Sequence, residues 1–153
     1  MAYDFEVRDV PAQPALFIRH TCKQAELGLV MAKLFPEVGA RIKAIGAQAA
    51  GMPFCRYTSW RDQDCDIEAG MTVAAPAQGT DRVIAGQLGG VSAACTVHTG
   101  PYEGLQDAHS AAAQWVVDNG KEVAGGPWEV YANDPGQVKD PKLFKTEIYW
   151  PIK

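Results

Sequence analysis

Two similar stretches of the chain decide its fold: GAQAAGMPFCRY at residues 46–57 and GKEVAGGPWEVY at residues 120–131. They align without gaps at an offset of 74, and Phe54 then lies opposite Trp128. Upstream, RHT at 19–21 aligns with VHT at 97–99, and downstream Glu68 aligns with Glu147. The offset changes only between these blocks, where loops can absorb insertions. We interpret the chain as two copies of one supersecondary unit.

Each copy is predicted to be a strand, a helix and two further strands, from the alternation and the helical spacing of its apolar residues. For the first copy the elements are a strand at 15–21, a helix from about 27 to 45, and strands at 54–60 and 66–74. For the second copy they are 91–99, 103–119, 127–132 and 143–150, with the turn-rich DPGQVKDPK at 134–142 before the last. Two lead strands, near 4–10 and 81–88, complete the set.

Particular residues set the ends of the two helices. Gly46 and Gly120 follow the last apolar residue of each helical pattern, where a glycine commonly closes a helix. Pro36 interrupts the first pattern, so we expect a kink there or two helical pieces, with Pro36 in the first turn of the second piece.

The predicted fold class is α+β, in a single domain over residues 1–153. Repeat one spans about 4–74 and repeat two about 81–152, joined by a linker at 74–80. Either sheet alone would expose one apolar face. We therefore expect the repeats to pack about a pseudo-twofold axis, with antiparallel sheets forming a central groove and the helices outside. Junctions of this kind favour small-molecule pockets.

The composition excludes several classes of protein. Fourteen basic against eighteen acidic residues give a net charge of −4, which argues against direct DNA binding. No membrane span or signal peptide is visible, so a cytoplasmic location and no membrane partner are expected. The four cysteines and three histidines lack ligand spacing, so no metal and no cofactor is predicted, and the thiols are expected to be reduced and buried.

Alternation along the last strand of each repeat selects two carboxylates. Phe144, Ile148 and Ile152 share the apolar face that a helix should cover, which turns Glu147 to the opposite face. The same reasoning applied to Ile67 and Met71 turns Glu68 away from its helix. We therefore expect Glu68 and Glu147 to look into the groove, although both could also be ordinary solvated positions.

Aromatic residues near these carboxylates suggest a cationic ligand, because a desolvated carboxylate needs a positive partner and ring faces attract cations. Tyr149 shares a strand face with Glu147. The predicted ligand-binding residues are Glu147, Tyr149, Glu68, Tyr102, Trp128, Tyr131, Phe54 and Trp60. Alternation separates Phe54 and Trp128 from Tyr57 and Tyr131, so at least one of these pairs packs in the core.

Three motifs resemble one family. HTGPYEGL at 98–105 resembles the H-x-G-P-Y-x-x-L signature of the GyrI-like, or bacterial effector-binding, domain found in AraC-type and MerR-type multidrug regulators. The G-x-P-W-x-x-Y element at 125–131 and TEIYWPI at 146–152 fit the same family. The resemblance covers about residues 4–152. It implies two SHS2-type repeats around a groove, with a buried glutamate at Glu147 that takes amphipathic, often cationic or aromatic, molecules.

This resemblance favours a stand-alone small-molecule-binding module linked to transcription regulation or toxin resistance. Residues 1–10 already have a strand pattern, so no helix-turn-helix is expected before the domain, and DNA contact would need a separate protein partner. A second possibility is a gyrase-inhibitor-like protein-interaction module.

A third possibility, implied by one branch of the same family, is a hydrolase of strained, cyclopropane-containing toxins. No nucleophile motif is visible in the sequence, so no catalytic residue is predicted for the binding module. If the chain is a hydrolase, Glu147, Tyr149 and Tyr102 are the candidate catalytic residues, because a carboxylate can orient water and a phenol can donate a proton.

Overall fold

The computed structural model describes residues 3–133 and 138–153. Residues 134–137, in the turn-rich segment before the last strand, lie outside the described residues. The chain forms two compact units. We call residues 11–90 the continuous unit, and we call residues up to 10 together with 91–153 the split unit. Each combines antiparallel strands with a helix, which confirms the α+β class.

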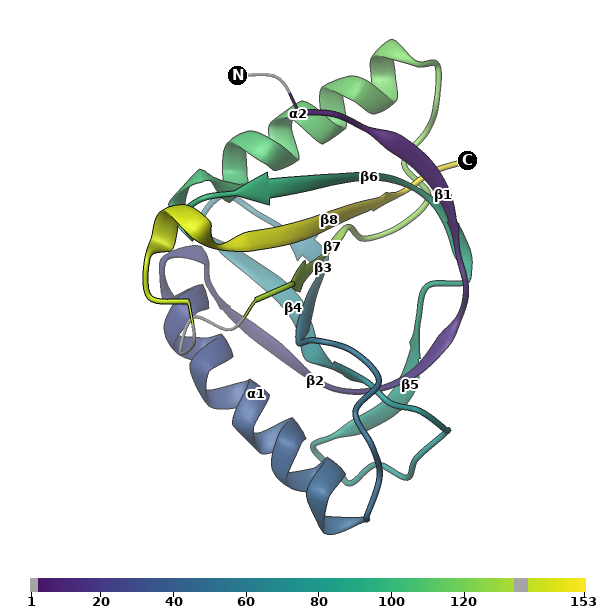
Figure 1. The fold of residues 1–153 in the computed structure, drawn as a ribbon, viewed down its shortest axis with the longest axis vertical. Coiled ribbons are helices and arrows are strands. Elements are labelled where there is room, and N and C mark those ends of the chain that lie inside the picture. The colour runs from purple at the N-terminus through teal and green to yellow at the C-terminus, as the bar shows by residue number, and fades with distance from the viewer. Residues whose placement is uncertain (1–2, 134–137) are drawn as a thin grey trace. The chain divides into compact units, whose positions relative to one another are not determined.

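The continuous unit has the strand order β3-β4-β2-β5. Its elements are β2 (Gln13–Lys23), a 3₁₀ turn (Gln24–Glu26), α1 (Leu27–Ala44), β3 (Phe54–Trp60), β4 (Asp64–Thr72) and β5 (Ile84–Leu88). Every neighbouring pair of strands is antiparallel. Helix α1 runs alongside β2 (Figure 1) and buries Leu34, Val38 and Ile42. These residues belong to the apolar stripe predicted from the sequence.

The split unit has the strand order β1-β6-β8-β7. Its elements are β1 (Glu6–Val10), β6 (Val91–Thr99), a 3₁₀ turn (Tyr102–Gly104), α2 (Leu105–Asp118), β7 (Trp128–Tyr131), a 3₁₀ turn (Pro141–Leu143) and β8 (Lys145–Pro151). Helix α2 buries Leu105, Ala108, Ala112 and Val116. Leu105 and Ala108 pack with Ile148 of β8, and Val116 packs with Ala94 of β6. These contacts place α2 on one face of the sheet.

The lead strands are exchanged between the sequence repeats. β1 opens the first repeat but pairs with β6 of the second, Glu6 opposite Cys95. β5 opens the second repeat but pairs with β2 of the first, Leu88 opposite Gln13. The compact units therefore differ from the repeats at 4–74 and 81–152, because each lead strand hydrogen bonds along the edge strand of the other repeat. The shared groove and the single domain concern the placement of the two units, and they stay predictions.

Both helices end just before the glycines at which the sequence predicted their ends. Gly46 has φ +66° and Gly120 has φ +67°, a left-handed conformation that glycine adopts without steric cost. In each case the next residue donates a backbone hydrogen bond into the last turn, from Ala47 to Ile42 and from Lys121 to Val116. These matched caps support the interpretation that the two halves are repeats.

The expectation of two helical pieces around Pro36 is wrong, because α1 is one continuous helix with Pro36 inside it. Proline lacks one backbone donor and costs a helix interior about 3 kcal/mol. The buried stripe of Leu34, Val38 and Ile42 spans the proline and packs on both sides of it, which offsets that cost. Among the described residues, no helix is long and apolar enough to cross a membrane.

Candidate functional site

Glu147 lies on the sheet face opposite α2, as the alternation predicted. Its neighbour Ile148 is fully buried and packs with Leu105 and Ala108 of the helix. Glu147 itself is paired with Val97 of β6 on one side and with Val130 of β7 on the other. Because residues opposite each other in an antiparallel sheet share a face, the carboxylate is flanked by two apolar side chains.

Tyr149 and Trp128 lie on the same face, one step along the strands. Tyr149 is paired with Cys95 and Trp128, and its hydroxyl donates to Glu147 Oε1 at 2.8 Å. The rings of Trp128 and Tyr149 stack with centroids 4.9 Å apart and planes 9° apart. We call Cys95, Val97, Trp128, Val130, Glu147 and Tyr149 the Glu147 face.

The Tyr149 phenol and the Cys95 thiol on this face both have raised pKa values. Burial, followed by the hydrogen bond to Glu147, raises the pKa of the Tyr149 phenol well above its usual value. Burial also raises the pKa of the Cys95 thiol to about 11, with a smaller opposing contribution from Arg8. At neutral pH both groups are therefore protonated. The phenol is a hydrogen-bond donor, and the thiol is a poor nucleophile.

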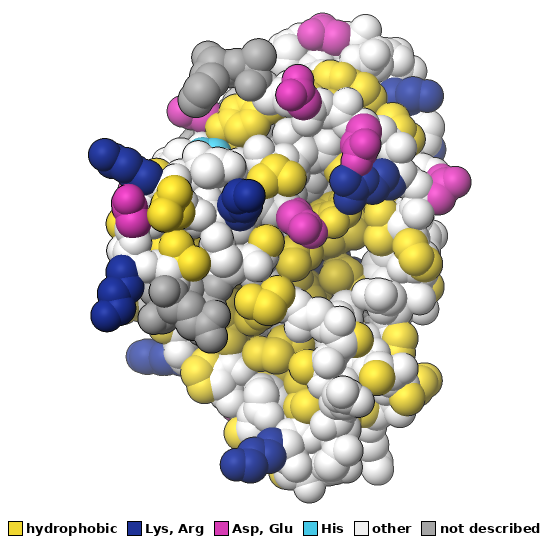
Figure 2. All heavy atoms as spheres, viewed as in Figure 1, with side chains coloured by type: hydrophobic (Ala, Val, Ile, Leu, Met, Phe, Trp, Pro, Cys, Tyr) yellow, Lys and Arg dark blue, Asp and Glu magenta, His cyan; other side chains and the backbone are white. Residues whose placement is uncertain are grey.

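A pocket of about 480 Å³ opens beside Glu147 and Tyr149, within the split unit. β1 pairs with β6 only as far as Cys95, which lies opposite Glu6. Residues 96–99 of β6 therefore have no β1 neighbour, and they form one wall of the pocket. The segment before β1 supplies the other wall. The volume is in the range of small-molecule sites. On the face shown in Figure 2, basic and acidic side chains are interspersed around apolar ones.

Glu6 and Arg8 stand at the rim of this pocket and form an ion pair with each other. His98, also in the lining, is 7% exposed and has both ring nitrogens engaged. The Tyr3 hydroxyl lies 2.9 Å from Nδ1, and the Pro101 carbonyl lies 3.0 Å from Nε2. A carbonyl only accepts, so Nε2 carries a hydrogen, and in the neutral ring Nδ1 accepts from the Tyr3 hydroxyl. His98 therefore anchors the pocket wall.

Glu68 occupies the corresponding position in the continuous unit and also faces away from its helix. It is paired with Arg19 of β2 and Arg56 of β3. Arg19 Nε lies 2.7 Å from Glu68 Oε2, and Arg56 Nε lies 2.7 Å from Oε1. Both guanidinium groups also lie over the ring of Phe17, 5.9 Å and 5.5 Å from its centroid. Glu68 is 5% exposed, and its carboxylate charge is already balanced by these arginines.

The two glutamates therefore differ in their cross-strand neighbours. Arg19 and Arg56, opposite Glu68, occupy the positions that Val97 and Val130 occupy opposite Glu147. Within the described residues, no ion pair forms on Glu147. Its hydrogen bond comes from a neutral phenol. Among the described residues, Glu68 thus has two ion pairs and Glu147 has none, and the Arg8 that lines the same pocket as Glu147 is paired with Glu6.

The predicted aromatic residues separate by face. Phe54 is paired with Gly70, on the Glu68 side of its sheet, and is fully buried. Trp128 lies on the Glu147 side of the other sheet. Phe54 and Trp128, which the repeat alignment sets opposite each other, therefore occupy equivalent faces of their sheets. Tyr131 is paired with Thr146 on the helix-covered side, and its hydroxyl donates to Glu129 at 2.7 Å. Tyr131 is therefore not brought together with Glu147.

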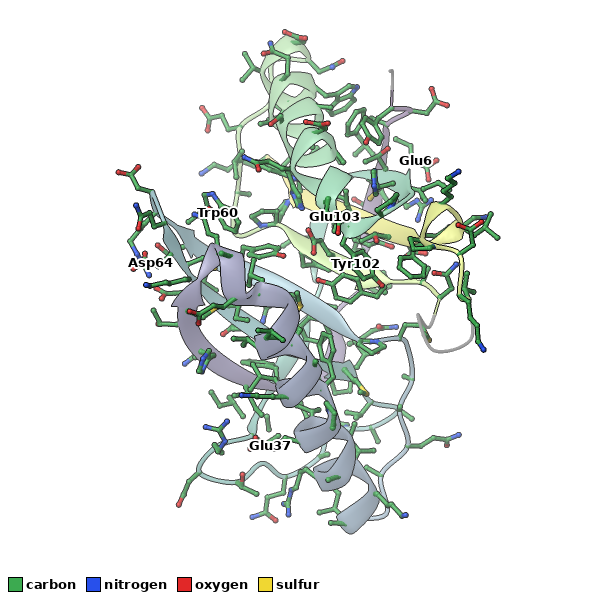
Figure 3. All side chains as sticks on the ribbon, turned by 90° about the vertical axis from the view of Figure 1, so that its left-hand side faces the viewer. Glu6, Glu37, Trp60, Asp64, Tyr102 and Glu103 are labelled. Atoms are coloured by element: carbon green, nitrogen blue, oxygen red, sulfur yellow. The ribbon has the colours of Figure 1, made fainter. Side chains whose placement is uncertain are left out.

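Tyr102 and Trp60 are held by other contacts, and Trp60 belongs to the continuous unit. Tyr102 is in the 3₁₀ turn before α2, next to Glu103 (Figure 3), and its ring stacks on Phe144 with centroids 5.1 Å apart. Trp60 ends β3 near Asp64 of the β3–β4 hairpin (Figure 3), is 52% exposed, and contacts Tyr57 edge-on. The structure thus brings together Glu147, Tyr149 and Trp128 from the predicted set.

Sequence reasoning missed a buried polar network under α2. Glu129 is 2% exposed and accepts from the Tyr131 hydroxyl. Its other oxygen lies 2.6 Å from His109 Nε2, and Trp150 Nε1 donates to His109 Nδ1 at 3.0 Å. An indole nitrogen only donates, so His109 carries its hydrogen on Nε2. The network secures α2 against β7 and β8. Alternation could have found Glu129, which shares a face with Tyr131.

A model of the GyrI-like small molecule binding domain family matches residues 3–153. No curated protein sequence matches the chain. Among solved structures, the C-terminal domain of EcmrR is similar with a TM-score of 0.87 and 22% identity, over 100% of this chain and 99% of that one. In the EcmrR–DNA complex the TM-score is 0.88 at 22% identity over 99% of this chain, which spans only 57% of the longer EcmrR chain.

Two further structures share the fold at lower identity. SAV2435 bound to tetraphenylphosphonium has a TM-score of 0.68 and 11% identity, over 100% of this chain and 94% of that one. A hydrolase from Listeria innocua has a TM-score of 0.66 and 13% identity, over 97% of this chain and 91% of that one. At these identities the likeness concerns the fold.

Proposed function

We propose that this chain, which belongs to the family of GyrI-like small molecule binding domains, binds amphipathic aromatic cations on the Glu147 face. The observation that carries the proposal is the carboxylate between Val97 and Val130, where the equivalent carboxylate Glu68 has two arginines. A partly buried carboxylate with apolar neighbours is stabilised by a cation, and a ligand that brings one gains that interaction.

The aromatic pair supports a ligand with delocalised or shielded charge. Trp128 is 3% exposed and stacks in parallel on Tyr149, so it supports the Tyr149 ring from one side and leaves the opposite face of that ring beside the carboxylate. Each ring face attracts a nearby cation by up to about 2 kcal/mol when water is excluded. A small, strongly hydrated ion would lose more hydration than it gains here. SAV2435, which shares the fold, was solved with tetraphenylphosphonium, a cation of the favoured kind.

Small-molecule binding by this chain would act in transcription regulation or toxin resistance in the cytoplasm. The longer EcmrR chain, whose C-terminal domain shares this fold, was solved in complex with DNA. In such an arrangement the present domain senses the ligand, and DNA contact is made by a different segment or a separate protein.

Direct binding of tetraphenylphosphonium, measured by isothermal titration calorimetry, tests the proposal. The neutral comparator is triphenylphosphine oxide, which keeps three of the four phenyl rings and has no net charge. We expect saturable binding of the cation and at least about tenfold weaker binding of the neutral compound, because a single charged contact is worth more than about 1.4 kcal/mol. Equal affinities for both compounds would contradict a site that reads charge.

Replacing Tyr149 by leucine tests the aromatic part of the site. The variant removes one ring of the stacked pair, so we expect tetraphenylphosphonium to bind about 5- to 30-fold more weakly, which corresponds to the loss of about 1–2 kcal/mol of ring–cation attraction. The matched control is Tyr102→Leu, a tyrosine of the same unit that stacks on Phe144 instead. Calorimetry that finds the larger loss in Tyr102→Leu would move the site to the start of α2.

One contact favours hydrolysis of a strained electrophile as a second candidate function. Tyr149 donates to Glu147 Oε1, which places a proton donor beside a possible water-orienting carboxylate. The raised pKa of the phenol keeps that proton in place at neutral pH. A structurally similar Listeria innocua protein is described as a hydrolase. The constellation lacks an activated nucleophile, so the substrate would have to carry its own strain.

We expect no catalysed hydrolysis of p-nitrophenyl acetate by this chain. Its release of p-nitrophenol should match that of Glu147→Gln, because neither the protonated Cys95 nor Tyr149 attacks an unstrained ester. A cyclopropane-containing electrophile, followed by chromatography, is the second assay. Turnover of that compound which disappears in Glu147→Gln would establish the hydrolase. Fast ester hydrolysis that depends on Glu147 would show a stronger active site than the one described.

A further inference from the structure

Cys22 and Cys65 face each other across two neighbouring strands of the continuous unit. The β2–β4 register places them directly opposite, on the face that α1 covers. Residues opposite in an antiparallel pair have Cα atoms about 4.5–5.5 Å apart, and a disulfide requires about 4.4–6.8 Å. Each thiol also shifts the pKa of the other, as expected for side chains that face each other. In the structure both cysteines are reduced.

We propose that Cys22 and Cys65 form a reversible intramolecular disulfide when the protein meets a low-molecular-weight disulfide such as oxidised glutathione. The other two cysteines are placed differently, because Cys55 is paired with Ala69 and Cys95 with Glu6 and Tyr149. Only this pair, among the cysteines, has a second cysteine directly across the ladder. The proposed site is independent of the Glu147 face, which lies in the split unit.

The two cysteines have different roles in this reaction. Cys22 is 8% exposed and Cys65 is fully buried, so the oxidant reaches Cys22 first. Burial raises the pKa of both thiols, to about 12 for Cys65. The contact between them adds to the rise in the pKa of Cys65 and opposes the rise in the pKa of Cys22, so Cys22 ionises more readily than Cys65. Cys22 is therefore the attacking thiol and Cys65 the resolving thiol.

The steps balance as a two-electron exchange. The Cys22 thiolate attacks one sulfur of oxidised glutathione, the S–S bond of glutathione breaks, and one glutathione leaves as thiolate. Cys65 then gives its proton to solvent and attacks the Cys22 sulfur, which releases the second glutathione. Two cysteine thiols are oxidised to one disulfide, and one glutathione disulfide is reduced to two thiols.

The register also indicates that the bond is readily reduced again. Gln24 donates its backbone N–H to Gln63, and Val73 donates to Pro14, so these opposed pairs are hydrogen-bonded pairs of the same ladder. Hydrogen-bonded and non-hydrogen-bonded pairs alternate along an antiparallel ladder, so every second pair from Gln24–Gln63 or from Pro14–Val73 is hydrogen-bonded. Cys22 and Cys65 are such a pair, and its side chains are farther apart than in the alternate pairs. Closing a disulfide there draws the strands slightly together, and such bonds are the labile ones.

The test uses the full chain, reduced and then incubated natively with oxidised glutathione. After alkylation of free thiols, trypsin should yield residues 20–23 (HTCK) linked to residues 62–82, a pair that dithiothreitol separates. Below the thiol pKa values, the rate of linkage should rise about tenfold per pH unit because the thiolate fraction does. Cys55 and Cys95 lie on other tryptic peptides and should remain alkylated.

Variants separate the roles. Cys65→Ser should keep a glutathione adduct on Cys22, because the resolving thiol is missing, and Cys22→Ser should leave Cys65 unmodified. The double variant Cys55→Ser, Cys95→Ser should form the linkage at the wild-type rate. Linkage that appears only in urea, linkage to Cys55 or Cys95, or separate alkylation of Cys22 and Cys65 after oxidation would each overturn the proposal.

Discussion

Glu147→Gln is expected to weaken tetraphenylphosphonium binding by about 2–5 kcal/mol, which is a loss of about 30- to several-thousand-fold in affinity. The amide keeps the size of the side chain and can still accept from Tyr149, but it carries no charge to meet the cation. The neutral triphenylphosphine oxide should lose much less. Calorimetry with both compounds measures the difference, and equal losses would show that the charge of Glu147 is not read.

The arginines around Glu68 suggest a sharper version of this experiment. Val97→Arg places a guanidinium opposite Glu147, in the position that Arg19 has opposite Glu68. The added charge should neutralise Glu147 from within the chain, so cation binding should fall although the carboxylate is intact. Val97→Leu is the matched control for side-chain bulk and should retain binding. A Val97→Arg variant that binds the cation as tightly as the wild type would count against Glu147 as the cation receptor.

Glu68→Gln is expected to destabilise the fold by about 2–4 kcal/mol, or to lower the melting temperature by about 5–15 °C. The substitution leaves Arg19 and Arg56 as two positive charges on one face without their shared carboxylate. The Arg56 side chain is only 20% exposed, so water replaces the lost contact poorly. Urea unfolding followed by circular dichroism gives the change in the free energy of unfolding.

The two glutamine variants serve as controls for each other. Glu147 forms no ion pair within the described residues, so its replacement leaves no arginine without a partner. Glu147→Gln should therefore change the free energy of unfolding by less than about 0.5 kcal/mol. Glu68→Gln, if it is folded at the assay temperature, should retain most of its affinity for tetraphenylphosphonium. The reverse pattern, in which Glu147 carries stability and Glu68 carries binding, would contradict the division of roles that the cross-strand pairs define.

The repeat made most of the fold predictable. Because each strand–helix–strand–strand copy supports the other, the strand predicted at 91–99 coincides with β6, and the two glycine caps are in place. Local patterns could not assign the partners of the lead strands, since β1 pairs with residues 81 to 89 positions away and the sequence of a strand does not identify its partner. Continuity through Pro36 was also hidden, because it depends on the packing of α1.

The candidate site was predictable in part. Alternation placed Glu147 and Tyr149 on one face but left open whether Trp128 joins them, which the β7–β8 register decides. It could not tell a paired carboxylate from an unpaired one, since the pairs Arg19–Glu68 and Arg56–Glu68 depend on sheet register. The signal was nevertheless present, because the repeat alignment already set Arg19 against Val97, and Arg56 lies opposite Val130 at the offset of 74. Comparing the neighbours of equivalent residues between repeats would have revealed the asymmetry.

The exchange of the lead strands has a consequence for synthesis on the ribosome. The continuous unit is complete once residue 90 has emerged, and it can fold while the rest of the chain is still being made. Residues 6–10 have by then been outside for the whole time, without the β6 edge on which they belong. β1 is thus made before the continuous unit but placed after it, and it stays unpaired until translation supplies β6.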